Sequence, residues 1–478
     1  MKKRILSLAL ICVMLLSALP AAAVAADTPV FTDVKDSDYF ATAVRWAVSW
    51  GVTNGTSETT FSPDEICTRA QVVTFLWRAH GEPEPKGGSN PFADVPKGSY
   101  YERSTLWAVE QGITTGTSEE PKLFSPDAPC TNAEIITFIW RAKGSQAPEF
   151  PSPLTSQWPD VYYKDAVTWA DNTAMLEDEG EVFDPIRFCT RGKTVAWLWR
   201  EAQVYASDVD GLIKCIAPGH VIHLAPGVYN LTEWLDAAAA SGGLVKMVDD
   251  LELAAALGDG IDLSPYVVLS RVLDGYELII HDVRNLTLEA TQPEGGQVSI
   301  VVAPRYANVL TFENCDTVIL QNMTMGHTPE QGNCTGGVLS FRDCGRVALG
   351  AMDLYGCGTY GIIAERVDSI QTVDSVIRDC SYGLVDLTNV KDAGFGGVTF
   401  RDSSGFDMLD IRESSLSFQS CTFQNNKWDE DWCHFISLDA ASSARFSACV
   451  FDKATYYDLT GERFAESNIL VESSKVVE

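Results

Sequence analysis

The chain has 478 residues, of which 21% are charged, and a formal net charge of −30 at pH 7. This length suits more than one domain. A chain this acidic does not attract nucleic acid or anionic lipid through its overall field, so we expect no nucleic acid among its partners.

The N-terminal stretch Met1–Ala26 has the pattern of a secretory signal peptide. Three basic residues precede an apolar run, Ile5–Leu19, and small residues follow it up to Ala26. This pattern predicts that residues 1–26 are removed and that the mature protein is secreted. No later segment is apolar enough to predict a membrane span, so we expect any attachment to a surface to be noncovalent.

A sequence block then occurs three times. CTRAQVVTFLWRA at Cys67–Ala79 returns as CTNAEIITFIWRA at Cys130–Ala142 and as CTRGKTVAWLWREA at Cys189–Ala202. Ahead of the first block, the spacing of apolar residues in Tyr39–Trp50 predicts a helix, and Thr68 is expected to cap a second helix. A unit of about 60 residues is too small to bury this much apolar surface alone, so the three copies should pack together.

These motifs resemble the S-layer homology (SLH) domain, which anchors bacterial surface proteins to cell-wall polysaccharide. The resemblance covers roughly Asp27–Arg200, with copies at 27–82, 90–144 and 155–202. It implies an α-helical three-repeat bundle whose grooves hold an acidic, often pyruvylated, secondary cell-wall polysaccharide. The glycan contacts that it implies are Arg69, Arg191, Asp33, Asp94, Asp160, Trp46, Trp107 and Trp169. The alternative is that the tryptophans belong to the core and that the aspartates are caps or turn residues.

The three copies are not equally equipped for binding. The second copy has Asn132 where the first copy has an arginine. The third copy has Gly192 and Lys193 where the first copy has Ala70 and Gln71. The third copy also has Ala174 and Asp178 in place of two loop glycines. We therefore expect at most two complete grooves.

After about residue 204 the helical pattern gives way to short alternating strands. The phrases FENC, FRDC, IRDC, FQSC and FSAC recur between Phe312 and Cys449. Recurring phrases with several strands between them predict coils of a solenoid. Residues 204–478 resemble the right-handed parallel β-helix of the pectate-lyase superfold, with a helical insertion at about 232–258. The expected fold is thus multidomain, a helical bundle followed by an all-β solenoid.

The 13 cysteines suggest buried thiols more than bridges. Cys67, Cys130 and Cys189 occupy one equivalent place in the three copies and are expected to be small buried hydrophobes. The recurring phrases place Cys315, Cys344, Cys380, Cys421 and Cys449 at one repeated turn, where a ladder of free thiols is expected. No CxxC spacing predicts a zinc site, and we expect no cofactor, since Ca²⁺ is not indicated.

Two functions stay open for the solenoid. It can bind or present glycan on the surface, as an adhesin or structural protein, with an external polysaccharide as partner. The alternative is a polysaccharide lyase or glycoside hydrolase, because proteins of this resemblance often are. The catalytic candidates are His327, Glu330, Asp353 and Glu365. The alternative is that these four are solvated turn residues without a catalytic role. Trp428 and Trp432 are candidates for a sugar platform, or else for a cap on the last coil.

Overall fold

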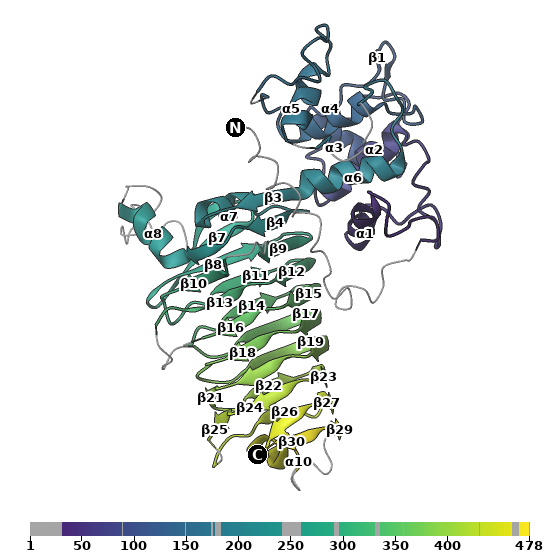
Figure 1. Ribbon diagram of the computed structural model, residues 1–478. Coiled ribbons are helices and arrows are strands. Elements are labelled where there is room, and N and C mark those ends of the chain that lie inside the picture. The colour runs from purple at the N-terminus through teal and green to yellow at the C-terminus, as the bar shows by residue number, and fades with distance from the viewer. Residues whose placement is uncertain are drawn as a thin grey trace, which may run out of the picture.

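A computed structural model describes residues 31–87, 89–148, 150–173, 175–176, 183–240, 260–290, 296–329, 335–356, 358–429, 431–460 and 468–477. The expected signal peptide, Ala174, Asp178, Glu330 and residues 241–258 of the expected insertion lie outside these ranges. A helical region sits at one end of a long β-solenoid, and the coils of the solenoid stack away from it (Figure 1).

The helical region consists of three helix pairs. Their bounds are α1 (Ala41–Ser49) with α2 (Arg69–Ala79), α3 (Glu102–Glu110) with α4 (Asn132–Ala142), and α5 (Lys164–Asn172) with α6 (Arg191–Ala202). A short hairpin, β1 (Ser118–Glu119) and β2 (Lys122–Leu123), precedes α4.

The second helix of each pair starts at a threonine cap. Thr68, Thr131 and Thr190 each accept a hydrogen bond through Oγ1 from the backbone N–H three residues later. In α2 and α4 that third residue is Gln71 or Glu134, whose side chain bonds back to the threonine N–H. Each of these two helices therefore begins with a complete capping box. The expected cap at Thr68 is confirmed.

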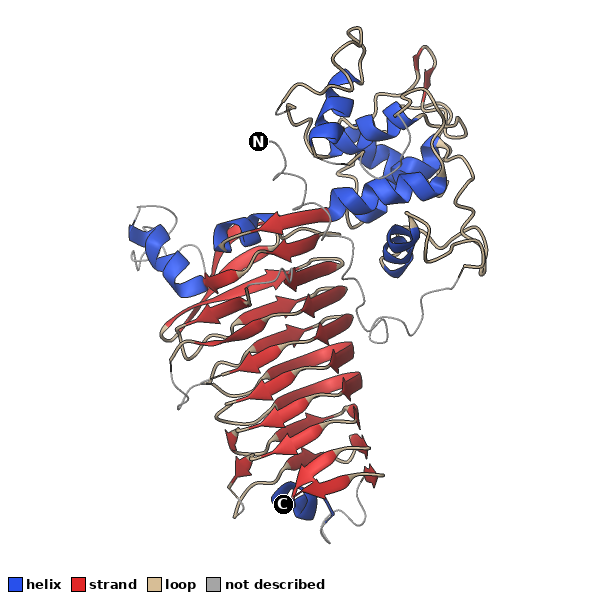
Figure 2. Cartoon of the chain, viewed as in Figure 1, coloured by secondary structure: helices blue, strands red, loops and turns tan. Residues whose placement is uncertain are grey.

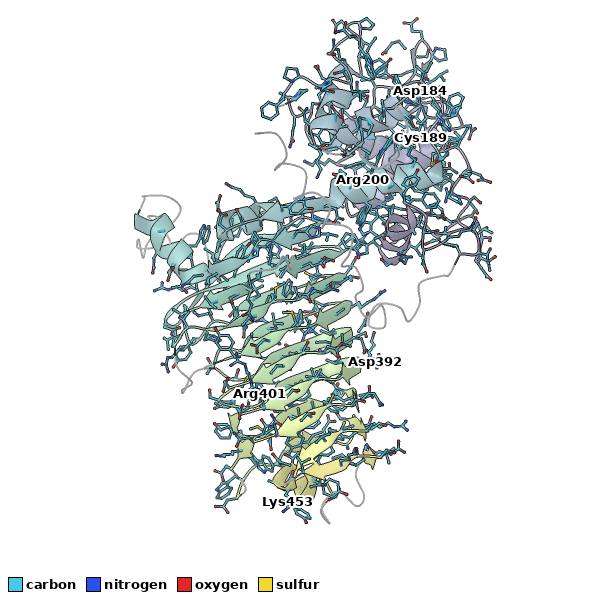
Figure 3. The ribbon with its side chains drawn as sticks, viewed as in Figure 1. Asp184, Cys189, Arg200, Asp392, Arg401 and Lys453 are labelled. Atoms are coloured by element: carbon cyan, nitrogen blue, oxygen red, sulfur yellow. The ribbon has the colours of Figure 1, made fainter. Side chains whose placement is uncertain are left out.

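A closed ring of backbone hydrogen bonds joins the three pairs. The N–H of Cys67 donates to the carbonyl of Cys189 at 3.0 Å, Cys130 donates to Cys67 at 3.0 Å, and Cys189 donates to Cys130 at 2.9 Å. All three cysteine side chains are fully buried and none is in a disulfide, as predicted, and Cys189 lies inside the helical region (Figure 3). Each pair thus depends on the other two for its backbone bonding.

Three walls of parallel strands form the solenoid (Figure 2). The first wall contains β8 (Gly275–His281), β11 (Leu310–Glu313), β14 (Leu339–Arg342), the first halves of β17 (Ile362–Val373) and β19 (Val385–Gly396), β22 (Leu409–Arg412) and β26 (Ile436–Leu438). The second wall contains β3 (Gln203–Ala206), β4 (Val221–Leu224), β9 (Leu286–Ala290), β12 (Thr317–Gln321), β15 (Arg346–Gly350), the second halves of β17 and β19, β23 (Ser415–Gln419), β27 (Ser443–Ser447) and β29 (Ile469–Glu472).

The third wall is a separate nine-stranded sheet. It contains β5 (Gly227–Asn230), β10 (Val298–Val302), β13 (Thr324–His327), β16 (Asp353–Tyr355), β18 (Val376–Arg378), β20 (Thr399–Arg401), β24 (Thr422–Gln424), β28 (Val450–Asp452) and β30 (Lys475–Val477). The prediction of a solenoid is confirmed.

A few elements lie outside the walls. The hairpin β6 (Gly260–Ser264) and β7 (Val267–Val272) pairs antiparallel with β8, and β21 (Ser404–Gly405) pairs with β25 (Lys427–Trp428). Helices of the described residues outside the helical region are α7 (Val209–Cys215), α8 (Leu231–Ala240), which starts the expected insertion, and α10 (Lys453–Thr460). Lys453 marks the far end of the solenoid (Figure 3).

The corners explain the recurring phrases of the sequence. At most corners one residue adopts a left-handed backbone conformation, for example Asn314 at φ 52°, Asp379 at φ 56° and Asn389 at φ 55°. Asn and Asp tolerate this conformation best among residues with a side chain. The next residue points inward, where a small or apolar side chain fits, so a pattern such as Asn-Cys or Asp-Cys marks a turn of the coil.

The single cysteine ladder is wrong, because the five cysteines lie at three different corners. Cys315 and Cys344 lie between the first and second walls, and Cys421 and Cys449 between the second and third walls. Cys380 lies between the third and first walls and hydrogen-bonds Ser403. All five are buried and none is in a disulfide, and the thiols of Cys344 and Cys449 donate to the carbonyls of Phe312 and Phe418, at 3.6 and 3.5 Å. The phrases look alike because all three corners demand the same local geometry.

Stacked phenylalanines fill the solenoid core. Phe312 lies over Phe341 with ring centroids 5.3 Å apart, and Phe418 lies over Phe446 at 4.6 Å. These residues open four of the recurring phrases, so identical positions meet on successive coils. Such stacking adds favourable ring contacts to the burial of a large apolar area.

The helical region passes directly into the solenoid. Helix α6 ends at Ala202 and β3 begins at Gln203, with no linker residue between them. Side contacts reinforce this connection, since Arg284 forms an ion pair with Glu82 at 3.1 Å and the Asn285 amide donates to the carbonyl of Trp50 at 3.2 Å.

Candidate functional site

The start of each second helix packs on a loop of the neighbouring helix pair. The backbone N–H groups of Arg69, Asn132 and Arg191 donate to the carbonyls of Ala128, Arg187 and Glu65, respectively. We call these three places the first, second and third junctions, after the helices α2, α4 and α6. Arg69 and Arg191, which the sequence predicts to contact glycan, lie at the first and third junctions.

At the first junction, the arginine is already neutralised. Arg69 Nη1 lies 3.2 Å from Glu134 Oε1, and its Nε donates to the carbonyl of Phe124 at 2.9 Å. The guanidinium also lies over the rings of Phe124 and Phe138, at 5.3 and 5.1 Å. Glu134 belongs to the next helix pair, so the ion pair ties two pairs together.

The third junction repeats this geometry without the carboxylate. Arg191 Nε donates to the carbonyl of Phe61 at 3.1 Å, and the guanidinium lies between Phe61 and Phe75, at 5.0 and 5.3 Å. Here the residue equivalent to Glu134 is the neutral Gln71. Within the described part of the chain, Arg191 forms no ion pair, although the residue is only 3% exposed. A buried cation without a counter-ion favours an anion from outside.

The second junction has no cation at this place. Asn132 Nδ2 donates to the carbonyl of Asp184 at 2.8 Å, and its Oδ1 is buried without a hydrogen-bond partner among the described residues. Among the described residues, the three junctions therefore hold an arginine with an ion pair, an asparagine and an arginine without one.

Two of the three aspartates predicted to contact glycan accept hydrogen bonds from loops. Asp33 accepts hydrogen bonds from the N–H groups of Phe61 and Ser62, at 2.9 and 2.7 Å. Asp94 accepts the same pair of bonds from Phe124 and Ser125, at 2.8 and 2.7 Å. Asp160 is exposed. Asp33 and Asp94 thus hold the loops that carry Phe61 and Phe124 beneath the two arginines.

The tryptophans lie in the core of the helical region. Trp46, Trp107 and Trp169 are all buried, and the indole N–H groups of Trp46 and Trp169 have no hydrogen-bond partner among the described residues. Trp46 packs against Trp50 at 5.6 Å, and Trp107 against His80 at 5.6 Å. This placement favours the alternative in which they are core residues.

The structure does not bring the described catalytic candidates together. His327 is buried, with Nε2 2.9 Å from the carbonyl oxygen of Ala307, and burial lowers its pKa below the usual value. Asp353 forms a two-point ion pair with Arg378 on the third wall, whereas Glu365 pairs with Arg366 on the first wall. Each side chain has its own partner, and Glu330 lies outside the described residues.

The two tryptophans of the proposed sugar platform differ in exposure. Trp428 is half-buried and packs on Phe435 with centroids 5.7 Å apart. Trp432 is 83% exposed. Only Trp432 presents most of its ring surface to solvent.

Sequence reasoning missed an acidic pair on the first wall. Asp386 of β19 and Asp410 of β22 are register partners on neighbouring coils. One guanidinium, that of Arg412, contacts both carboxylates, and its Nη2 lies 3.8 Å from Asp386 Oδ1. Burial, then the charge of Asp410, raises the pKa of Asp386 to about 6. The interval between the two residues equals one coil, which is the signal in the sequence that would have paired them.

Among the described residues, no group of three or more His, Cys, Asp and Glu side chains is arranged to hold a metal ion. Every helix in that part of the chain is too short or too polar to cross a lipid bilayer.

Comparison with known proteins gives partial matches. Residues 30–73 match the S-layer homology domain. A cell surface protein of Thermoanaerobacter kivui is 32% identical over 131 residues, which cover 27% of this chain and 17% of that protein. An endoglucanase of Bacillus sp. (strain KSM-635) is 29% identical over 183 residues, covering 36% of this chain and 19% of that enzyme.

Among solved structures, a rhamnogalacturonan lyase aligns with 56% of this chain and 68% of its own, at a TM-score of 0.29 and 9% identity. So slight a likeness says nothing about activity. The chain carries an S-layer homology domain at residues 30–73, and its matches span less than a fifth of each curated relative.

Proposed function

We propose that this protein is secreted by a bacterium and held noncovalently on the cell wall through its helical region, which displays the solenoid outside. The S-layer homology domain at residues 30–73 and the similarity to a cell surface protein support this proposal. In this proposal the second and third helix pairs are further copies of the same unit. Their equivalent threonine caps and the closed cysteine ring support that assignment.

The observation that carries the proposal is the unpaired charge of Arg191. Its guanidinium lies between two phenylalanine rings, and no carboxylate of the described residues forms an ion pair with it. An arginine fork suits a carboxylate through two parallel hydrogen bonds. Because Arg191 is so little exposed, the group that reaches it must be a small anionic substituent of a sugar. A carboxylate on a cell-wall polysaccharide, including a pyruvate ketal, fits this requirement.

The first junction plays a different part. Arg69 already has Glu134 as its anion, so we assign it to holding two helix pairs together. The second junction has Asn132 in the place of the arginine. Glycan anchoring is therefore assigned to the third junction, and this is fewer than the two grooves that the sequence allowed.

Co-sedimentation of the full chain with purified bacterial cell walls tests the proposal. The unmodified protein should sediment with walls that carry a pyruvylated polysaccharide and stay in solution after hydrofluoric acid has stripped that glycan. Arg191→Gln should weaken sedimentation at least about tenfold, since a hydrogen bond to a charged group contributes about 1.5–3 kcal/mol. Asn132→Ala, at the junction without a cation, is the matched control and should bind normally.

Undiminished binding to stripped walls would make peptidoglycan the receptor and refute the glycan anchor. Equal losses in Arg191→Gln and Asn132→Ala would refute the assignment to the third junction. A thermal melt of each variant separates loss of binding from loss of folding.

The solenoid is proposed to bind or present glycan. The described catalytic candidates lend no support to the alternative of a lyase or hydrolase, because each is occupied by its own partner.

A further inference from the structure

Aromatic side chains follow one another along a single corner of the solenoid. Tyr360, Tyr382 and Phe406 lie on successive coils, in the loops that lead from the third wall to the first wall. The ring centroids of Tyr360 and Tyr382 are 6.4 Å apart, and those of Tyr382 and Phe406 are 4.4 Å apart. The N–H of Phe406 donates to the carbonyl of Tyr382 at 2.8 Å, so the backbone holds this stacking in place. We call these three side chains the aromatic row.

Two members of the aromatic row face solvent, whereas Tyr360 is half-buried. Tyr382 is 36% exposed and Phe406 is 47% exposed, whereas the apolar residues that follow the left-handed turns at the opposite corner, such as Val367 and Val390, are buried. The corner loops further along in each direction also carry an exposed aromatic residue, Tyr306 before β11 and Trp432 before β26. Exposed aromatic surface in a line is not needed for the core and marks a place of contact.

Carboxylates flank the aromatic row. The register partner of Asp386 on the preceding coil is Ile363, three residues beyond Tyr360, and Asp410 follows Asp386 on the next coil. Burial, and then the charges of these two aspartates, raises the pKa of Tyr360 above its usual value. Asp386 and Asp410 share the guanidinium of Arg412. The flank therefore offers hydrogen-bond donors and acceptors, and its carboxylates outnumber its one cation.

This combination selects among extended ligands. Nucleic acid also stacks on aromatic rings, but it needs a positively charged groove, and the acidic flank repels it. An acidic polysaccharide is repelled for the same reason. A neutral polysaccharide meets neither obstacle. Its sugar rings have apolar C–H faces that suit aromatic side chains, which are rigid and lose little entropy on binding, and its hydroxyl groups suit the carboxylates and the guanidinium.

We infer that the aromatic row and the flanking Asp386–Asp410 pair form a binding face for a neutral polysaccharide that lies along the solenoid. Successive coils are about 4.8 Å apart, so an extended chain meets a new ring and a new polar group at each step. This face does not depend on the proposed wall anchor. The third junction presents a cation to an acidic glycan, whereas this face presents carboxylates to an uncharged one.

Affinity electrophoresis of the full chain tests the inference, with xyloglucan, glucomannan or hydroxyethylcellulose in the gel and with polygalacturonate as the acidic comparison. At least one neutral glycan should retard the protein, and polygalacturonate should not do so through this face. The double variant Tyr382→Ala/Phe406→Ala should lose at least about tenfold in affinity. Tyr205→Ala is the matched control, because Tyr205 is an exposed tyrosine on β3, outside the aromatic row.

Asp386→Asn/Asp410→Asn separates the roles of rings and carboxylates. This variant should lower the affinity for the neutral glycan several-fold and should allow polygalacturonate to bind. The inference is overturned if none of the three neutral glycans retards the protein, or if the aromatic double variant migrates like Tyr205→Ala. Because both aromatic side chains are exposed, a thermal melt should show the double variant folded, and each affinity is compared at equal folded fraction.

Discussion

Lys143 Nζ lies 2.8 Å from Glu201 Oε1, where the helical region meets the solenoid. The Glu201 side chain is only 4% exposed, and His80 Nε2 lies 3.6 Å from the same oxygen. These residues come from the ends of α2, α4 and α6, so one buried carboxylate joins all three helix pairs. The ion pair links the three helix pairs at the C-terminal ends of these helices, and the cysteine ring links them near the N-terminal ends.

Removing one partner of this pair should be costly. Lys143→Met leaves the buried Glu201 without its lysine, and loss of one partner of a buried ion pair typically destabilises a protein by about 3–5 kcal/mol. The double variant Lys143→Met/Glu201→Leu should recover most of that loss, because it leaves no buried charge. Urea denaturation measures both. The exposed pair of Arg45 and Asp36 is the control, and Arg45→Ala should change stability by less than about 0.5 kcal/mol.

Acid should unfold the helical region through Glu201. Lys143 and His80 outweigh the cost of burial and hold the pKa of Glu201 at about 2, below its ordinary value of 4.5. A carboxyl with a depressed pKa stabilises the fold above its unfolded pKa, and this contribution fades as the pH falls from about 4.5 towards 2. Urea midpoints measured across this window should fall with pH, and the slope should be shallower in Glu201→Gln. Equal slopes in both proteins would contradict this role.

His80 adds to the same trend at higher pH. Burial lowers its pKa below 6.5, so the folded protein binds a proton there less readily than the unfolded chain does. Stability should therefore begin to decline as the pH drops below about 6.5. In His80→Gln, the part of the decline above pH 4.5 should be smaller.

Exchanging the charges of two capping residues should move wall binding between junctions. Glu134→Gln keeps the capping box, as Gln71 does in α2, but frees Arg69 of its anion. This variant should bind walls more tightly. Gln71→Glu places a carboxylate beside Arg191 and should weaken binding at least about tenfold. Wall titrations of both variants provide the measurement, and a gain in Gln71→Glu would contradict the electrostatic account.

The thiols should behave as buried groups. Burial raises the pKa of Cys380 to about 12, so almost none is thiolate at neutral pH. Among the described cysteines of the folded protein, a thiol reagent should label half-buried Cys215 first and the buried ones only on denaturation. A reductant should leave the melting temperature unchanged, since loss of a structural disulfide would cost about 2–5 kcal/mol. A native bridge among the described cysteines, found by mass mapping, would contradict this expectation.

The left-handed corners offer a matched set of alanines. Ala351 and Ala448 adopt φ values of 50° and 55°, which cost an alanine about 1–2 kcal/mol relative to a permissive residue. Ala351→Gly and Ala448→Gly should each stabilise the solenoid by about 0.5–1 kcal/mol after the entropy of glycine is counted. Ala393→Gly, inside a strand of the second wall, should destabilise it by about 1 kcal/mol. Denaturant titration distinguishes the gain of stability expected at the corners from the loss expected in the strand.

Local chemistry made part of this structure predictable. The threonine caps could be read from the sequence because a cap and its partner are three residues apart. The solenoid could be predicted because Asn and Asp recur at many of the left-handed corners, each followed by a buried residue, and so leave a repeated pattern in the sequence. The same reasoning failed for the cysteine ladder, since corners between different walls impose the same short pattern.

Relationships between distant residues could not be read in this way. The difference between Arg69 and Arg191 depends on Glu134 and Gln71, which lie in other helix pairs. An apolar stripe with tryptophan predicts a helix, but it does not say whether the ring faces the core or a ligand. The aromatic row does have a sequence signal, because Tyr360, Tyr382 and Phe406 recur at the interval of one coil.

The absence of a linker between α6 and β3 has a mechanical consequence. Drag on a displayed solenoid pulls on its first strand, and Gln203 passes that tension straight into α6 without a flexible segment to absorb it. Helix α6 begins at the junction that holds Arg191 and is bonded into the cysteine ring. Force applied to the far end of the molecule therefore arrives at the proposed anchor, where the three helix pairs share the load.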